Sequence, residues 1–138
     1  MRVILDTIPH GAQDYDTCGN WKWRDGTLYV TVSEVGDWRS EVCVMLHEFV
    51  EAIFCHQDEV SEAAVTDFDL RWKPHDGIEE PGDDPASPYA MEHERAEVFE
   101  RHLAIALHLS WARHEALLAE CQRHGRGQRK LERWVNGG

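Results

Sequence analysis

The stretch VMLHEFVEAIF, residues 44–54, places three titratable side chains in the middle of an apolar segment. Apolar side chains recur at helical spacing through it and just before it: Val42, Leu46, Phe49, Val50 and Ile53. This period predicts an α-helix over about residues 38–57. Asp37 or Ser40 has a side chain able to cap its first turn.

The three titratable residues of this helix have the spacing of a metal site. His47 and Glu51 lie four residues apart, so they project from one helix face and can reach a common point. Glu48 lies about 100° further round, beside that point. In zinc peptidases with an HExxH helix, two ligands come from these positions and the adjacent Glu acts on water. Glu51 replaces the second His, and a carboxylate is a competent zinc ligand. The alternative is a polar stripe on a structural helix.

A second helix supplies further candidate ligands. It is predicted over about residues 89–121, with Gly125 and Gly127 ending it. His93 and Glu97 again lie four residues apart and share one face. Each predicted helix therefore presents a pair of metal-binding side chains.

Together, the two helices resemble the zincin-like metallopeptidases, especially the compact repressor-cleaving ImmA/IrrE type, over about residues 20–110. In that family, an HExxH helix is followed by a helix with a ligand Glu, a small residue three positions later, an Asp or Asn next, and Phe two beyond. This chain has, at those spacings, His93, Ala96, Glu97 and Phe99. The resemblance implies that His93 is the third metal ligand and that Glu97 orients one of the ligands.

The chain departs from the family pattern in a compensated way. Glu51 stands at the position of the second His, and His93 stands at that of the ligand Glu, so the total remains two His and one Glu. A strict HExxH search would miss this HExxE variant. The chain also looks like small phage or prophage proteins of unknown function, which carry a similar HExxEA helix and a downstream EH pair, here Glu92-His93.

The resemblance implies a zinc-dependent hydrolase of the metallopeptidase type that acts on a peptide or protein. Zn²⁺ would be the cofactor, with Mn²⁺ or Fe²⁺ as alternatives. The metal would lower the pKa of water from about 15.7 towards about 7. Glu48 would take the proton and deliver it to the leaving amine. An extended substrate would add beside the edge strand of the hairpin. Candidates for stabilising the oxyanion are Tyr89, His75 and His56.

The rest of the chain predicts one α+β domain over residues 1–138. A strand is expected over residues 2–8, and residues 20–35 form a hairpin that turns at Asp25-Gly26. The expected architecture is zincin-like, with a small antiparallel sheet packed against two long helices.

Less regular segments follow the first helix. A short helix is expected between residues 61 and 72, although Ala64 stands where a capping box has Glu or Gln. Residues 73–89 hold four of the five prolines, so they predict a long loop, suited to covering a cleft. His102, His108 and His114 fall on different faces of the second predicted helix, which indicates surface or partly buried histidines.

The composition limits the partners. A net charge of −12, from 26 acidic and 14 basic residues, argues against nucleic-acid binding except weakly through the basic C-terminal tail, residues 122–138. No run of about 18 apolar residues predicts a membrane span. Four cysteines without a CxxC pair and no apparent signal peptide predict a cytoplasmic protein with free thiols.

Two other function classes remain open. The pairs His47/Glu51 and His93/Glu97 could hold two Mn²⁺, Fe²⁺ or Mg²⁺ ions, as in a carboxylate-rich metal enzyme such as a nucleotide pyrophosphatase. The hairpin argues against that class, because those proteins are helical throughout. Alternatively, the chain is a non-catalytic, phage-type binding protein on a zincin scaffold. The number of metal ions bound per chain distinguishes the two-ion enzyme from the zinc hydrolase. A Glu48→Gln variant distinguishes the non-catalytic protein, in which this substitution would change no hydrolysis.

Overall fold

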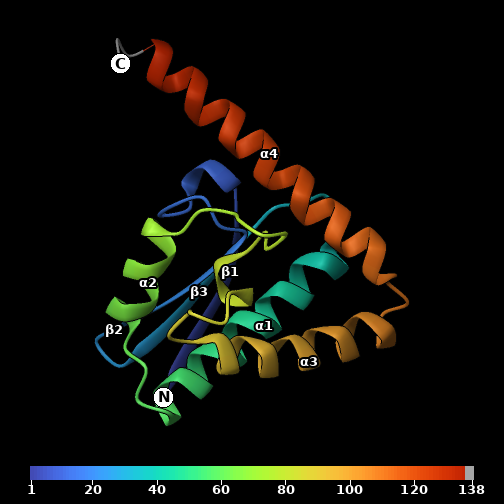
Figure 1. The fold of residues 1–138 in the computed structure, drawn as a ribbon. Coiled ribbons are helices and arrows are strands. Elements are labelled where there is room, and N and C mark those ends of the chain that lie inside the picture. The colour runs from blue at the N-terminus through green and yellow to red at the C-terminus, as the bar shows by residue number, and fades with distance from the viewer. Residues whose placement is uncertain (136–138) are drawn as a thin grey trace.

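The first regular element of the chain is a β-strand and the last is a long helix (Figure 1). A computed structural model describes the backbone of residues 1–135 and the side chains of residues 1–123. In chain order, the elements are β1 (Arg2–Ile8), the 3-10 turn η1 (His10–Ala12), β2 (Gly19–Arg24), β3 (Thr27–Ser33), α1 (Trp38–Gln57), α2 (Glu62–Arg71), the 3-10 turn η2 (Pro81–Asp83), α3 (Ala90–Ala106) and α4 (Trp111–Val135). The α+β class is confirmed.

The sheet is mixed, so the prediction of an antiparallel sheet was wrong for one strand pair. Its order is β1-β3-β2, with β2 antiparallel and β1 parallel to β3. The predicted hairpin is confirmed. Asp25 and Gly26 both have positive φ at its turn, as a two-residue hairpin loop requires. After β1, the chain crosses through η1 to the opposite edge of the sheet. The hairpin then returns β3 to the centre, alongside β1 and in the same direction.

The core lies between the sheet and α1. On β3, the alternate side chains Leu28, Val30 and Val32 are completely buried, as the two-residue period of a strand requires. α1 packs against β2 and β3, and α3 packs against the opposite side of α1 (Figure 1). α1 is therefore the middle layer of three.

This position of α1 changes which of its faces is buried. The predicted apolar stripe, from Val42 to Ile53, is only partly buried. The buried positions are Ser40, Cys43, Val44, His47, Glu51, Ala52 and Cys55. The most buried face of the central helix thus carries polar side chains, which need partners inside the protein.

The segment after α1 forms the expected short helix and loop. Ser61 caps α2 by accepting a hydrogen bond from the backbone N–H of Ala64 at 3.1 Å, without the reciprocal partner of a capping box. In the following loop, the carboxylate of Asp84 accepts hydrogen bonds from the indole of Trp72 at 3.0 Å and the backbone N–H of Ala86 at 2.9 Å. Asp84 thereby organises a segment with little regular structure.

The prediction of one helix over residues 89–121 was wrong, because the chain turns between α3 and α4. His108 has a φ of 56°, in the left-handed region, and ends the helical path. Ser110 then starts α4, where its hydroxyl accepts a hydrogen bond from the N–H of Arg113 at 3.2 Å. No Gly or Pro marks the break, and Ser110 was the available signal.

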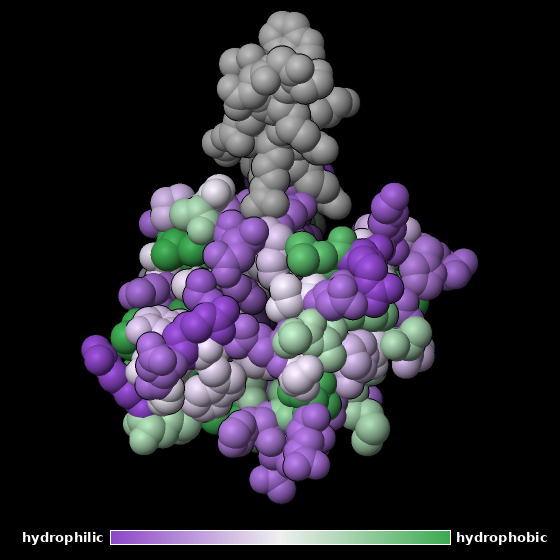
Figure 2. All heavy atoms as spheres, turned by 90° about the vertical axis from the view of Figure 1, so that its left-hand side faces the viewer, coloured by the Kyte–Doolittle hydropathy of each residue, from purple (hydrophilic) through white to green (hydrophobic). Residues whose placement is uncertain are grey.

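α4 continues past Gly125 and Gly127, so their assignment as its end was wrong. The basic tail of residues 122–138 is described as α4 backbone to Val135. Its side chains beyond residue 123 lie outside the described residues. Within residues 1–135, no helix combines the length and the apolar character that crossing a membrane requires. The face in Figure 2 is mainly hydrophilic, with small separate hydrophobic areas.

Leu28→Ala should lower the free energy of unfolding by about 2–5 kcal/mol, because it leaves a cavity in the central strand. The matched control is Leu70→Ala on α2, where the side chain is 63% exposed, and it should change that free energy by less than about 0.5 kcal/mol. Urea unfolding followed by tryptophan fluorescence measures both. Equal losses would contradict the central, buried position of β3.

Candidate metal centre

Three side chains from two helices converge on one point. His47 and Glu51 project from α1, one turn apart, and His93 projects from the start of α3. His47 Nε2 lies 3.0 Å from Glu51 Oε2 and 3.1 Å from His93 Nδ1. His93 Nδ1 lies 2.9 Å from Glu51 Oε2. The structure brings together the three residues predicted as metal ligands.

The donor atoms suit a small divalent cation. Zinc binds imidazole nitrogen and carboxylate oxygen at about 2.0–2.2 Å in tetrahedral geometry, which places neighbouring donor atoms about 3.3 Å apart. The donor atoms of His47, Glu51 and His93 are only slightly closer than this. A small outward movement would admit the ion. Two His and one carboxylate leave a fourth tetrahedral position for water or substrate, as in catalytic zinc sites.

Both candidate ligands on α1 are held by hydrogen bonds from other elements. His47 Nδ1 lies 2.8 Å from Glu100 Oε1 on α3, so this nitrogen donates to the carboxylate and leaves Nε2 facing the other ligands. Trp21 on β2 donates its indole N–H to Glu51 Oε1 at 3.0 Å. That bond leaves Glu51 Oε2 directed at the convergence point. Sheet and helix together therefore orient the two ligands.

His93 is held in the same manner by the loop before α3. Its Nε2 lies 3.1 Å from Asp83 Oδ1, and its Nδ1 faces the other ligands. Gly82 lies against the ring, because a Cβ there would come within 2.5 Å of His93 Nδ1. The acidic, Pro-rich loop was expected to cover a cleft, and here it contacts a candidate ligand directly.

The contacts to the ligand histidines come from Glu100 and Asp83 in place of the predicted Glu97. Glu97 lines the same pocket, and its carboxylate lies 3.7 Å from Arg101. Sequence reasoning missed Glu100, although it follows His93 by seven residues and so lies two turns along the same helix face. Asp83 belongs to a loop without periodicity, so no pattern identified it.

A buried chain of polar groups extends from His47 to α4. Glu100 Oε2 accepts from His114 Nε2, and His114 Nδ1 lies 2.6 Å from the hydroxyl of Ser40. His114 is completely buried, so the expectation of a surface or partly buried histidine was wrong for this residue. His102 and His108 are exposed, as expected.

The predicted base, Glu48, lies beside the ligands. It packs on the backbone of β2, because a Cβ at Gly19 would come within 2.7 Å of Glu48 Oε1. Burial raises the pKa of Glu48 well above its usual value, and the charge of Glu51 adds to this effect. A cation at the ligand atoms would favour the ionised carboxylate, which a general base requires.

The three candidate ligands shift one another's pKa values. Burial alone would raise the pKa of Glu51, but the neighbouring imidazoles of His47 and His93 lower it to about 2. Burial would lower the pKa of His93, but hydrogen bonds with Asp83 and Glu51 raise it to about 10. Both shifts follow from the contact of a buried carboxylate with two imidazoles, and a metal ion at these donor atoms would take the place of protons when it binds.

The ligands line a pocket of about 1140 Å³. On one wall, the hydroxyl of Tyr15 donates to Asp69 at 2.8 Å, and that of Tyr89 donates to the same carboxylate. Of the three candidates for stabilising an oxyanion, Tyr89 lines the pocket. His75 is exposed and turned toward Asp84, and His56 is exposed near the ring of Trp23.

Comparisons of this chain with protein-family models, with curated proteins and with solved structures find no match. The resemblance to zincin-like metallopeptidases therefore depends on the two helix motifs alone. It stays a prediction, which the convergence of His47, Glu51 and His93 supports without establishing an activity.

Gly82→Ala should weaken Zn²⁺ binding by at least about tenfold, because the added methyl group displaces the ring of His93. Gly19→Ala is the matched control, since its methyl group meets Glu48, which is not a predicted ligand. Competition with a chromogenic chelator measures both affinities, and circular dichroism checks folding. Unchanged affinity in Gly82→Ala would contradict His93 as a ligand.

Glu100→Gln should weaken Zn²⁺ binding by about 10–100-fold, because it removes the carboxylate that orients His47. Glu97→Gln is the control on the same helix and should change the affinity little, because Glu97 lies next to Arg101. The same chelator competition applies. A larger effect from Glu97→Gln would restore the role that the family resemblance assigned to that residue.

Proposed function

We propose that this protein is a zinc-dependent hydrolase of the metallopeptidase type. One observation carries the proposal: each of three converging ligands is held by a hydrogen bond from outside, so that one free donor atom of each faces the same point. Such outer hydrogen bonds are typical of metal sites, because they fix the tautomer and orientation of the ligands.

The chain's own groups have distinct roles in the proposed reaction. When bound, Zn²⁺ supplies Lewis acidity, which polarises a carbonyl group and lowers the pKa of water. Glu48 accepts a proton from the attacking water and donates it to the leaving amine. Glu100 and Trp21 keep His47 and Glu51 in position throughout.

The pocket wall suits an extended peptide. β2 is an edge strand of the sheet and contributes Gly19 and Trp21 to the pocket. The N–H of Trp23 points away from β3, where it donates to Glu62 at 2.7 Å. In an antiparallel pair, the backbone N–H and C=O groups of every second residue point to the same side. Those of Trp21 therefore also point away from β3, so a peptide strand can add there.

The charge of the pocket favours a basic substrate. Acidic side chains from α2, α3 and the loop between them line it: Glu62, Asp69, Glu79, Glu80, Asp83 and Glu97. A cleft lined by one sign of charge concentrates ligands of the opposite sign. We therefore expect peptides with Lys or Arg near the scissile bond to be preferred.

The two-ion alternative has one observation in its favour. Glu80, Asp83 and His93 form another group that could hold an ion, so His93 would be shared between two ions. The originally predicted second pair, His93 with Glu97, does not make this group. Loss of two ions per chain on His93→Ala would favour the two-ion enzyme over the zinc hydrolase.

Wild-type protein purified without chelator or a His tag should contain a Zn²⁺ ion that His93→Ala lacks, because that variant removes one of three ligands. Inductively coupled plasma mass spectrometry measures the difference between the two. No difference after zinc is added back would overturn the proposal.

Glu48→Gln should retain the metal and lose hydrolysis by at least about 10²-fold, because an amide cannot accept the proton. Cleavage of a library of basic peptides, followed by mass spectrometry, gives the rate. Glu94→Gln serves as the control, since Glu94 is exposed on α3 and does not line the pocket. Equal cleavage by wild type and Glu48→Gln would favour the non-catalytic binding protein.

A further inference from the structure

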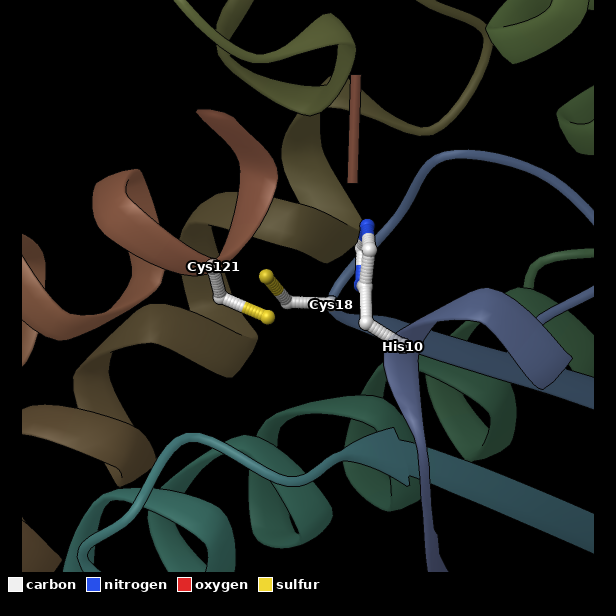
Figure 3. A group of neighbouring side chains, drawn as sticks. All are labelled: His10, Cys18 and Cys121. Carbon is white, nitrogen blue, oxygen red and sulfur yellow. The ribbon is translucent and has the colours of Figure 1, made fainter. Parts of the chain in front are cut away.

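A different cluster of side chains that could bind a metal ion lies where α4 meets η1, and one of its members, Cys18, also lines the pocket described above. It consists of His10 in η1, Cys18 before β2, and Cys121 in α4, whose donor atoms lie within 4.8 Å of one another. Figure 3 shows the two sulfur atoms facing each other with the imidazole beside them. The connection between β1 and β2 and the distant helix α4 therefore bring two thiols and one imidazole together.

The environment of His10 is that of a metal ligand. Its Nε2 lies 2.8 Å from Asp16 Oδ1, so a carboxylate holds this nitrogen from behind and leaves the lone pair on Nδ1. Nδ1 accepts from the hydroxyl of Ser33 at 2.8 Å. That hydroxyl has another acceptor, the carbonyl of Thr17 at 3.4 Å, so it can release Nδ1 without losing its own partner.

The cluster is also largely enclosed by protein. Cys18 is 7% exposed and the side chain of His10 is 9% exposed, while Cys121 is partly buried. Each thiol faces a backbone carbonyl, Leu118 for Cys18 and Glu34 for Cys121, at 3.7 and 3.8 Å. These contacts are weak, so a stronger bond to a cation would replace them at little cost.

We infer that His10, Cys18 and Cys121 form a second metal site, which binds a thiophilic divalent cation such as Zn²⁺. Thiolate and imidazole are the ligands that zinc prefers, and tetrahedral bonds of about 2.3 Å place two sulfur atoms about 3.8 Å apart. The atoms of the cluster need to move by no more than about 1 Å to reach this geometry. A disulfide would use the two sulfur atoms and would not involve the carboxylate-held imidazole beside them.

This cation would fasten α4 to the body of the protein. His114, Leu118 and Cys121 lie at spacings of four and three residues, so they share the inward face of α4. Leu118 packs against the main core, and His114 belongs to the buried chain that ends at His47. A cation at the second site would therefore hold α4 in place. The buried chain of polar groups depends on the position of this helix.

Cobalt absorption tests this site separately from the first one. Co²⁺ titrated into metal-free protein with a phosphine reductant should produce the near-ultraviolet charge-transfer band of a cobalt–thiolate bond. The band should disappear in Cys18→Ala and in Cys121→Ala, and it should persist in His93→Ala, because the first centre contains no thiol. His10→Ala should require more cobalt for the same band.

Cys43→Ala is the matched control, since Cys43 is a buried thiol outside the cluster, and its band should equal that of the wild type. Circular dichroism verifies that each variant is folded. The proposal is overturned if the folded, reduced wild type gives no band, or if the band survives in Cys121→Ala. It is also overturned if the untreated chain carries a Cys18–Cys121 disulfide by mass spectrometry and binds no cobalt once reduced.

Discussion

The buried contact of Glu51 with His47 and His93 is the constraint on which the arrangement of the other elements depends. Moving an ionisable group out of water costs several kcal/mol unless a partner compensates. α1 buries such groups on its most enclosed face, between sheet and α3, so neighbouring elements must supply partners. They do so from three directions: Trp21 from β2, Glu100 from α3, and Asp83 from η2. The described side chains contain no buried polar atom without a partner.

Close approach of the backbone is the second requirement of this arrangement. Gly19 and Gly82 bring β2 and the loop before α3 against Glu48 and His93, at distances that a Cβ would not allow. Neither glycine has a positive φ, so the reason for glycine is space and not backbone conformation. β2 and the loop before α3 therefore lie directly against Glu48 and His93, and leave no room for water at these two contacts.

The turn between α3 and α4 allows the buried chain of polar groups to extend from His47 to α4. His114 follows His93 by 21 residues. In a continuous helix the two residues would therefore lie roughly 30 Å apart, at 1.5 Å per residue. The left-handed conformation of His108 reverses the path and returns His114 to Glu100. The same reversal brings Cys121 to the loop that contains Cys18, so the inferred second metal site depends on it.

The sequence by itself determined the helix of residues 38–57, the hairpin, and the placement of His47 and Glu51 on one helix face, because these depend on local periodicity and on spacing within one helix turn. That His93 joins them was implied by the family resemblance, and the structure places its Nδ1 beside their donor atoms. It did not determine the parallel pairing of β1, the break at His108, or the partners Trp21, Asp83 and Glu100. Those depend on contacts between residues distant in the chain, for which a single sequence carries no periodic signal. The predicted apolar stripe of α1 shows the same limit. The apolar pattern predicted where the helix lies in the sequence, but its polar face is buried because the sheet packs on one side of α1 and α3 on the other.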